Sequence, residues 1–176
     1  MERVLITGIT GKSGEFLFEE IASNIDKLHD YYFGFVVRNK EKARFISNKL
    51  ENCSVYIGDL NDEVFLERVF SDGYTSLLHI AGIQKSLNIV RAAVIGGVKW
   101  MILVHTTGIF SRYKAAGEGY RIIESKIHNL LSGKEIALTI LRPTMIYGNV
   151  HDGNVAVFMK MVYKLRIFPV VNHANY

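Results

Sequence analysis

The sequence is poor in the features that mark secreted, membrane-spanning and metal-binding proteins. Cys53 is the one cysteine, so an intramolecular disulfide is impossible. No apolar run approaches the roughly 18 residues that a transmembrane helix needs. The six histidines are scattered and show neither HxxxH nor CxxC metal spacing. We therefore expect no disulfide framework, no membrane span and no metal site.

The composition is that of one globular domain. The 176 residues suffice for a single α/β core, and we expect one domain over residues 1–176. Basic and acidic residues alternate, so the net charge of +4 and the pI of 9.1 favour a phosphate-bearing cofactor. A nucleic-acid partner would need a basic face with exposed aromatics, which dispersed cations do not predict. The chain starts at Met1 without a signal-peptide pattern, which predicts a cytoplasmic protein.

Short apolar runs recur along the chain, as in strands buried on both faces of a parallel sheet. They lie at 4–6, 32–37, 55–57, 77–81, 100–104 and 136–141. Segments with helical spacing lie between them, at 17–28, 64–69, 87–94 and 123–131. Strand and helix therefore alternate. This predicts a Rossmann-type, doubly wound parallel sheet in three layers, with about six to seven strands.

A glycine-rich loop follows the first expected strand and opens a helix. Residues Thr7 to Gly14 read TGxxGxxG, in which the glycines permit a tight turn, close approach of a pyrophosphate and helix–strand packing. Backbone N–H groups and the helix dipole at such a helix start favour phosphate. The run from Gly11 to Ser13 also resembles the end of a Walker A loop, but Ile6 occupies the place of its first glycine, which excludes an NTPase. The residues expected to bind a dinucleotide here are Gly8, Thr10, Gly11, Lys12, Ser13 and Gly14.

The end of the second strand predicts which dinucleotide is bound. An NAD site usually places Asp or Glu there, against the ribose hydroxyls. This sequence has Arg38 instead, whose guanidinium could donate two hydrogen bonds to a 2′-phosphate, with Lys12 placed to assist. The alternative is an exposed arginine in a polar loop. We predict NADP(H) in preference to NAD(H).

Two further loops follow strands of the expected sheet. Asp59 and Leu60 come after the third strand and are placed to meet the adenine. Ala81 and Gly82 come after the fourth and are placed near the ribose. Both placements follow from the fold, because ligands bind outside the carboxyl ends of such strands.

Together these motifs resemble the atypical and extended short-chain dehydrogenase/reductases, in particular NmrA-like and NAD-dependent epimerase/dehydratase-like proteins. The likeness runs from Arg3 to about Pro169 and implies an NAD(P)-dependent redox or epimerase scaffold. It also implies that residues 143–148 pass the nicotinamide and substrate, with Pro143 touching the cofactor. The motifs that carry it are TGxxGxxG, Val37-Arg38, Asp59-Leu60, the run 78–82 (LHIAG) and the run 139–148 (TILRPTMIYG).

The catalytic pattern of that family is incomplete in this chain. Active members use a Tyr that transfers a proton, a Lys four residues later that lowers its pKa, and a Ser or Thr that orients the substrate. Thr107 and Tyr120 match two of these roles, but the lysine position falls on Glu124, whose carboxylate would raise a tyrosine pKa. Lys126 lies about 120° around the helix from Tyr120. Tyr113 is an alternative tyrosine.

Family members continue past the 139–148 motif into a region that covers the substrate, whereas this chain ends at Tyr176. Helical spacing over 154–165 predicts one more helix, and residues 167–171 could start a further strand. We expect the substrate-covering region to be absent or truncated, exposing apolar surface for a partner or a homodimer. The leading hypothesis is an NADP(H)-binding oxidoreductase or nucleotide-sugar epimerase/dehydratase-like protein with a small-molecule substrate. The alternative is a non-catalytic NADP(H)-sensing regulatory or interaction module.

Overall fold

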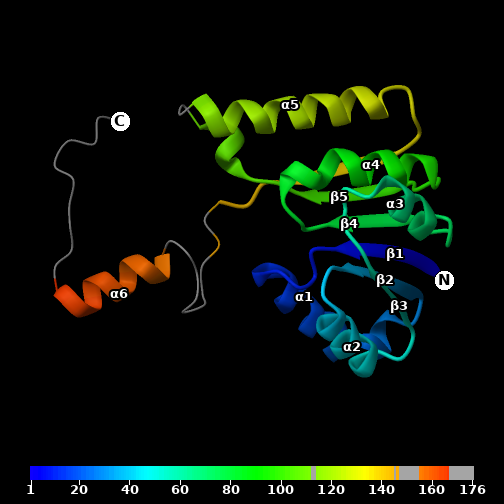
Figure 1. Ribbon diagram of the computed structural model, residues 1–176, viewed down its shortest axis with the longest axis horizontal. Helices are drawn as coiled ribbons and strands as arrows, with labels where there is room; N and C mark the ends of the chain where they lie inside the picture. The colour runs from blue at the N-terminus through cyan, green and yellow to red at the C-terminus, as the bar shows by residue number, and fades with distance from the viewer. Residues whose placement is uncertain (112–113, 145, 147–154, 167–176) are drawn as a thin grey trace. The chain divides into compact units, whose positions relative to one another are not determined.

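The computed structural model describes residues 1–111, 114–144, 146 and 155–166. The chain divides into two compact units, Met1–Arg142 and Pro143–Tyr176. The first unit contains a parallel sheet of six strands in the order β3-β2-β1-β4-β5-β6 (Figure 1). The strands are β1 (Glu2–Thr7), β2 (Tyr31–Val37), β3 (Cys53–Ile57), β4 (Ser76–His79), β5 (Trp100–Val104) and β6 (Ala137–Leu141). The expected Rossmann-type doubly wound sheet is confirmed, and each of the six expected apolar runs forms a strand.

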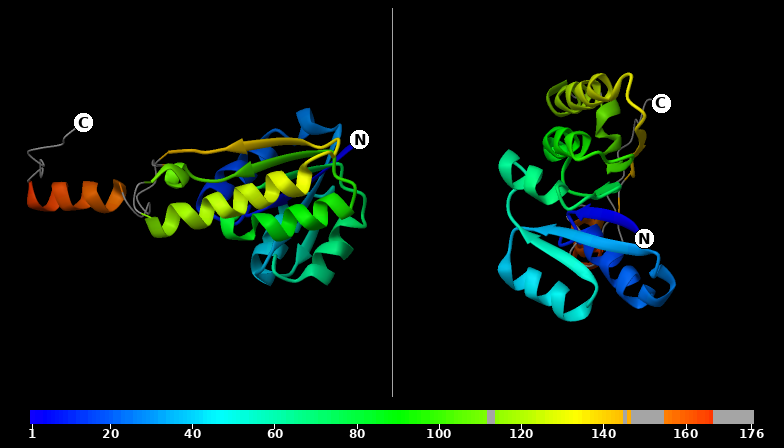
Figure 2. Two further views of the ribbon diagram at one scale, coloured as in Figure 1. Left: turned by 90° about the horizontal axis from the view of Figure 1, so that it is seen from above. Right: turned by 90° about the vertical axis from the view of Figure 1, so that its right-hand side faces the viewer.

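Helices connect consecutive strands and cover both faces of the sheet (Figure 2). Helices α1 (Lys12–Ser23) and α2 (Lys40–Lys49) lie on one face, and α3 (Glu63–Phe70), α4 (Ser86–Ile95) and α5 (Lys114–Leu131) lie on the other. Short 3-10 helices occur at η1 (Ile25–Leu28), η2 (Ile83–Lys85) and η3 (Thr107–Phe110). Alternation along β1 explains the two cores, because Leu5 packs toward α3 and α4 whereas Ile6 packs toward α1 and α2.

Two local features differ from the sequence pattern. Helix α2 has no long apolar stripe, since only Ala43 and Ile46 of its residues are buried. Its start is instead fixed by the Asn39 side chain, which accepts hydrogen bonds from the backbone N–H groups of Glu41 and Lys42 at 2.7 and 3.1 Å. The expected helix over 17–28 is interrupted, because α1 ends at Ser23 and a 3-10 turn follows.

The sheet is less covered at β5 and β6. Met101 and Leu103 point into the core beneath α4 and α5, so the alternating residues of β5 point to the opposite face. On that face Trp100 is 46% exposed and Leu141 is 49% exposed. This half of the sheet therefore presents apolar side chains outside the buried core.

The second unit contains helix α6 (Val155–Leu165), which confirms the helix expected over 154–165. The strand expected over 167–171 lies outside the described residues. Among the helices that the structure describes, none combines the length and the apolar character needed to span a bilayer.

Candidate functional site

The glycine loop after β1 makes a turn that only glycine accommodates. Gly8 has φ +84°, and a Cβ atom there would lie 2.4 Å from the backbone nitrogen of Ala81. The N–H of Gly11 donates to the carbonyl of Gly8 at 3.0 Å and closes the turn. The loop after β1 and the segment after β4 are therefore in backbone contact.

The start of α1 packs on the same loop. A Cβ atom on Gly14 would lie 2.2 Å from the carbonyl oxygen of Gly8. Gly11 occupies the N-cap position and has no side chain to accept from the first N–H groups of the helix. These two glycines have the roles expected of them, since one allows close packing and the other leaves the helix start open to an anion.

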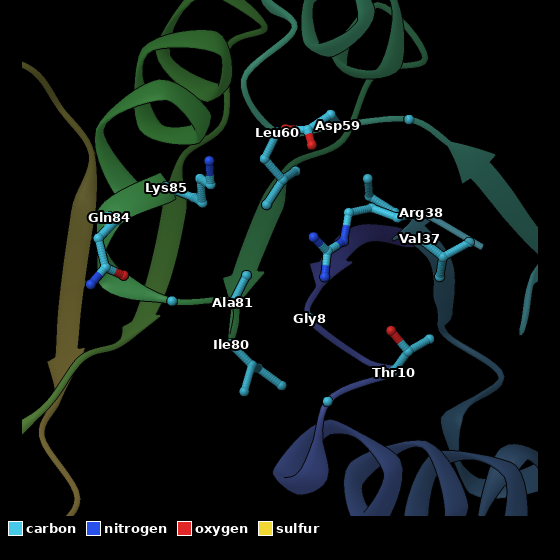
Figure 3. A pocket seen from close by; sticks show the side chains of 14 residues that line it. Gly8, Thr10, Val37, Arg38, Asp59, Leu60, Ile80, Ala81, Gln84 and Lys85 are labelled. Atoms are coloured by element: carbon cyan, nitrogen blue, oxygen red, sulfur yellow. The ribbon is translucent and has the colours of Figure 1, made fainter.

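A cleft of about 400 Å³ lies at the carboxyl edge of the sheet, where the strand order reverses between β1 and β4 (Figure 3). The carboxyl ends of four strands, β1 to β4, contribute to its walls. Its lining residues are Gly8, Thr10, Gly11, Val36, Val37, Arg38, Gly58, Asp59, Leu60, Ile80, Ala81, Gly82, Gln84 and Lys85.

Most of the residues expected to bind the dinucleotide meet in this cleft. Those that line it are Gly8, Thr10, Gly11, Arg38, Asp59, Leu60, Ala81 and Gly82. Lys12, Ser13 and Gly14 form the first turn of α1 and are not among the lining residues, with Gly14 buried beneath the loop. Pro143 belongs to the second unit.

The sequence reasoning missed Gln84 and Lys85. They follow Gly82 in η2 and line the cleft opposite the β2 end. The available signal was their position directly after the fourth strand, since any residue there lies at the carboxyl edge.

Arg38 is the cation at the end of β2. It is exposed, and in Figure 3 its guanidinium extends over the cleft between the Gly8 loop and Asp59. No carboxylate of the described residues lies within ion-pair distance of it, unlike Lys42 and Lys49 on α2, which pair with Glu15 and Glu19. The charge of Arg38 is therefore free for an anionic ligand.

Of the two residues expected to act in catalysis, Tyr120 lies against η3, the short helix that Thr107 begins. Thr107 begins η3, whose backbone is held by Thr106, because the Thr106 hydroxyl accepts from the Gly108 N–H at 3.1 Å. The ring of Tyr120 lies 3.4 Å from the position that a Cβ on Gly108 would take. Neither residue is among the lining residues of the cleft. Tyr113, Met145, Tyr147 and Gly148 lie outside the described residues.

Glu124 belongs to a buried polar chain that the sequence did not predict. Its carboxylate accepts from His105 Nδ1 at 2.8 Å and from Arg142 Nη2 at 2.5 Å. His105 Nε2 lies 3.0 Å from the hydroxyl of Ser86, the first residue of α4. Because the carboxylate only accepts, Nδ1 carries the proton and Nε2 accepts from Ser86. These hydrogen bonds join helices α4 and α5 to the residues that directly follow β5 and β6.

Burial and hydrogen bonding determine the charges of His105 and Glu124. Burial lowers the pKa of His105, and the neighbouring Glu124 carboxylate only partly opposes this effect, so the imidazole is neutral at neutral pH. Burial alone would raise the pKa of Glu124, but hydrogen bonds from Arg142 and His105 outweigh it and the pKa lies below its ordinary value. Glu124 is therefore a carboxylate that Arg142 neutralises.

A second buried histidine lies beneath the cleft. His79 ends β4 and is fully buried, and its Nδ1 lies 2.6 Å from the hydroxyl of Thr7 at the end of β1. Burial lowers the pKa of His79 to about 4, with a further contribution from nearby His105. This contact ties together the two strands whose following loops meet at Gly8 and Ala81.

No protein-family profile and no curated protein matches the sequence. Solved structures nonetheless share the fold. The enzyme WbmG of Bordetella bronchiseptica, solved with NAD, is 20% identical with a TM-score of 0.69, over 92% of this chain and 59% of that one. ChuY, an anaerobillin reductase of Escherichia coli O157:H7, is 18% identical with a TM-score of 0.63, over 92% and 90%.

A third similar structure is an NADPH-dependent quinone oxidoreductase of Escherichia coli, 20% identical with a TM-score of 0.64, over 92% of this chain and 51% of that one. At these identities the likeness shows the fold alone. The chain spans 59% of the length of WbmG.

Proposed function

We propose that this chain is an atypical short-chain dehydrogenase/reductase-like protein that binds a nicotinamide dinucleotide in the cleft between the Gly8 loop and the Asp59–Leu60 and Ala81–Gly82 segments. The observation that carries the proposal is the backbone contact of Gly8 with Ala81, which builds the cleft at the point where the strand order reverses. The N-terminus of α1, capped only by Gly11, would receive the pyrophosphate. The NAD-bound WbmG shares this fold and supports the proposal.

The preferred cofactor is NADP(H). Arg38 stands where an NAD site has an acidic residue, carries no ion pair with a described residue and extends over the cleft. A planar guanidinium suits a ribose 2′-phosphate because it can donate two parallel hydrogen bonds. Lys12, which we expect to assist Arg38, is not among the lining residues, so the proposal rests on Arg38.

Titration of the protein with NADPH and NADH, followed by calorimetry, tests both parts of the proposal. NADPH should bind at least about tenfold more tightly, equivalent to about 1.4 kcal/mol. Arg38→Ala should remove this preference while leaving NADH affinity unchanged. Arg91→Ala is the matched control, because Arg91 is exposed on α4 and is not part of the cleft lining. Failure of wild-type protein to bind either nucleotide would refute the proposed function.

Two activities are compatible with such a cofactor site. An oxidoreductase or epimerase/dehydratase-like enzyme would use Thr107, the first residue of η3, and Tyr120, whose ring lies beside Gly108 of the same short helix. A non-catalytic NADP(H)-sensing module is the second candidate. It is favoured by Glu124, which occupies the place of the family's lysine and is held by Arg142 and His105. Turnover of a small-molecule substrate distinguishes the two.

A further inference from the structure

Lys85 joins two walls of the cleft that come from strands far apart in the sheet. It ends η2, after β4, and its Nζ donates to the side-chain oxygen of Asn61 at 2.6 Å. Asn61 belongs to the segment after β3, and β3 and β4 are separated by β2 and β1 in the sheet. This hydrogen bond therefore crosses from one wall of the cleft to the other, as the positions of Lys85 and Leu60 in Figure 3 indicate.

The segment that Lys85 holds is already a tight turn. The N–H of Asn61 donates to the Asp59 carboxylate at 2.8 Å, and the N–H of Asp62 donates to the Asp59 carbonyl at 3.1 Å. Asp62 in turn caps α3 by accepting from the Phe65 N–H at 3.0 Å. The turn is thus fixed internally at both ends. Across the cleft, the contact described for it is the one with Lys85.

Lys85 also adds charge to the cleft. Lys85 and Arg38 are the cations among the lining residues, and Asp59 is the acid. The partner of Lys85 is a neutral amide, and no carboxylate of the described residues pairs with its ammonium. The two cations therefore add positive potential to the cleft from opposite sides (Figure 3).

We propose that Lys85 is a positioning residue for the dinucleotide: through Asn61 it holds the Asp59–Leu60 wall against the adenosine, the part that NADH and NADPH share. The inference rests on the proposed function of the cleft. It assigns Lys85 a role different from that of Arg38. Arg38 sets the preference between the two nucleotides, whereas Lys85 strengthens the binding of both.

Binding measurements on Lys85→Met, which keeps most of the side-chain stem, test this role. We expect Kd to rise about fivefold for NADH and NADPH alike, in line with loss of one solvent-exposed hydrogen bond. Lys85→Arg should restore most of the affinity, and Lys99→Met, an exposed lysine at the amino end of β5, should have no effect. An unchanged Kd in Lys85→Met, or a change for NADPH alone, would overturn the inference.

A double-mutant cycle separates action through Asn61 from direct contact with the ligand. Asn61→Ala should weaken binding by the same factor as Lys85→Met, and the double variant should be no worse than either. Additive losses would show that Lys85 contacts the ligand itself and would contradict the positioning role.

Hydrogen exchange of the ligand-free protein tests the hydrogen bond between Lys85 and Asn61 without any nucleotide. The amides of Asn61 and Asp62 should exchange faster in Lys85→Met than in wild type, while those of β1 stay unchanged. If wild-type protein bound no nucleotide, the proposed function would fail whatever this exchange showed. If it bound both nucleotides and exchange did not change, the inference alone would fail.

Discussion

Arg142 and Glu124 form a two-point ion pair that joins the carboxyl end of β6 to the middle of α5. Arg142 Nη2 lies 2.5 Å from Oε2 and Nε lies 3.2 Å from Oε1, and the Glu124 side chain is only 6% exposed. The same carboxylate accepts from His105. Glu124 therefore accepts hydrogen bonds from two neighbours, and its removal leaves both donors without their acceptor.

Replacing Glu124 should destabilise the fold strongly. Glu124→Ala leaves the Nδ1–H of His105 buried without an acceptor and removes the partner of Arg142, so we expect a loss of about 3 kcal/mol in the free energy of unfolding. Urea unfolding measures it. Glu118→Ala, on an exposed position of the same helix, should change stability by no more than about 0.5 kcal/mol. Equal effects of the two substitutions would contradict the assigned ion pair.

Acid should destabilise the protein through His79. The pKa of His79 is about 4 in the folded protein, below its ordinary 6.5, so the unfolded chain takes up a proton first as pH falls. The contribution of His79 to the free energy of unfolding is thus fully present above about pH 6.5. It falls as the pH decreases from 6.5 to 4, by about 3 kcal/mol in total. The contribution of His105 to stability also decreases as the pH falls, because its pKa in the folded protein is lowered too.

Unfolding free energies at pH 7 and 4.5 test this prediction. His79→Gln should be less stable than wild type at pH 7 but should show a smaller fall toward pH 4.5. His29→Gln is the control, since His29 is exposed in the turn before β2. A pH dependence unchanged in His79→Gln would refute the assignment of the acid sensitivity to this residue.

Gly8→Ala should eliminate nucleotide binding and also weaken the fold. The added Cβ meets the Ala81 nitrogen at 2.4 Å and the residue must keep φ near +84°, so the two loops at the cleft have to separate. Gly119→Ala is a matched control, because nothing lies within 4 Å of its Cβ position in α5. It should stabilise the protein by about 0.5–1 kcal/mol. Thermal unfolding and NADPH titration of both variants provide the measurements.

Tyr120→Phe tests whether the chain is an enzyme. If Tyr120 transfers a proton, kcat with a substrate found by screening carbonyl compounds and nucleotide sugars with NADP(H) should fall about 100-fold or more, while the Kd for the cofactor stays within about twofold. Tyr31→Phe, at the exposed amino end of β2, should leave kcat unchanged. Equal turnover by Tyr120→Phe would remove Tyr120 from the mechanism.

The sheet and most of the cleft could be predicted because their signals are local. Each strand is a short apolar run between turn residues, and the loop from Thr7 to Gly14 carries its glycines at fixed spacing. The apolar pattern does not predict helix α2, because the helix is defined by its cap at Asn39 and not by an apolar stripe.

The remaining parts of the site depend on contacts between distant segments. The four polar residues around Glu124 have no common spacing, so only the packed structure brings them together. Two lie in helices and two directly follow strands: Ser86, Glu124, His105 and Arg142. The contact between Lys85 and Asn61 likewise joins residues on either side of α3 and β4. A side-chain pair of this kind leaves no periodic pattern in the chain.

The place of the single tryptophan determines what optical signals from this protein report. Trp100 starts β5 and is 46% exposed, at the amino end of the sheet, whereas the cleft lies at the carboxyl end. The length of the strand separates the two ends by about 13 Å, at a rise of about 3.3 Å per residue. A nucleotide in the cleft would not touch the indole, so a change in the environment of Trp100 on titration would indicate movement of the sheet or a new contact at its amino end. Tryptophan fluorescence therefore reports unfolding of this protein without a direct contribution from contact with the nucleotide. Binding is better followed by the fluorescence of the reduced nucleotide itself.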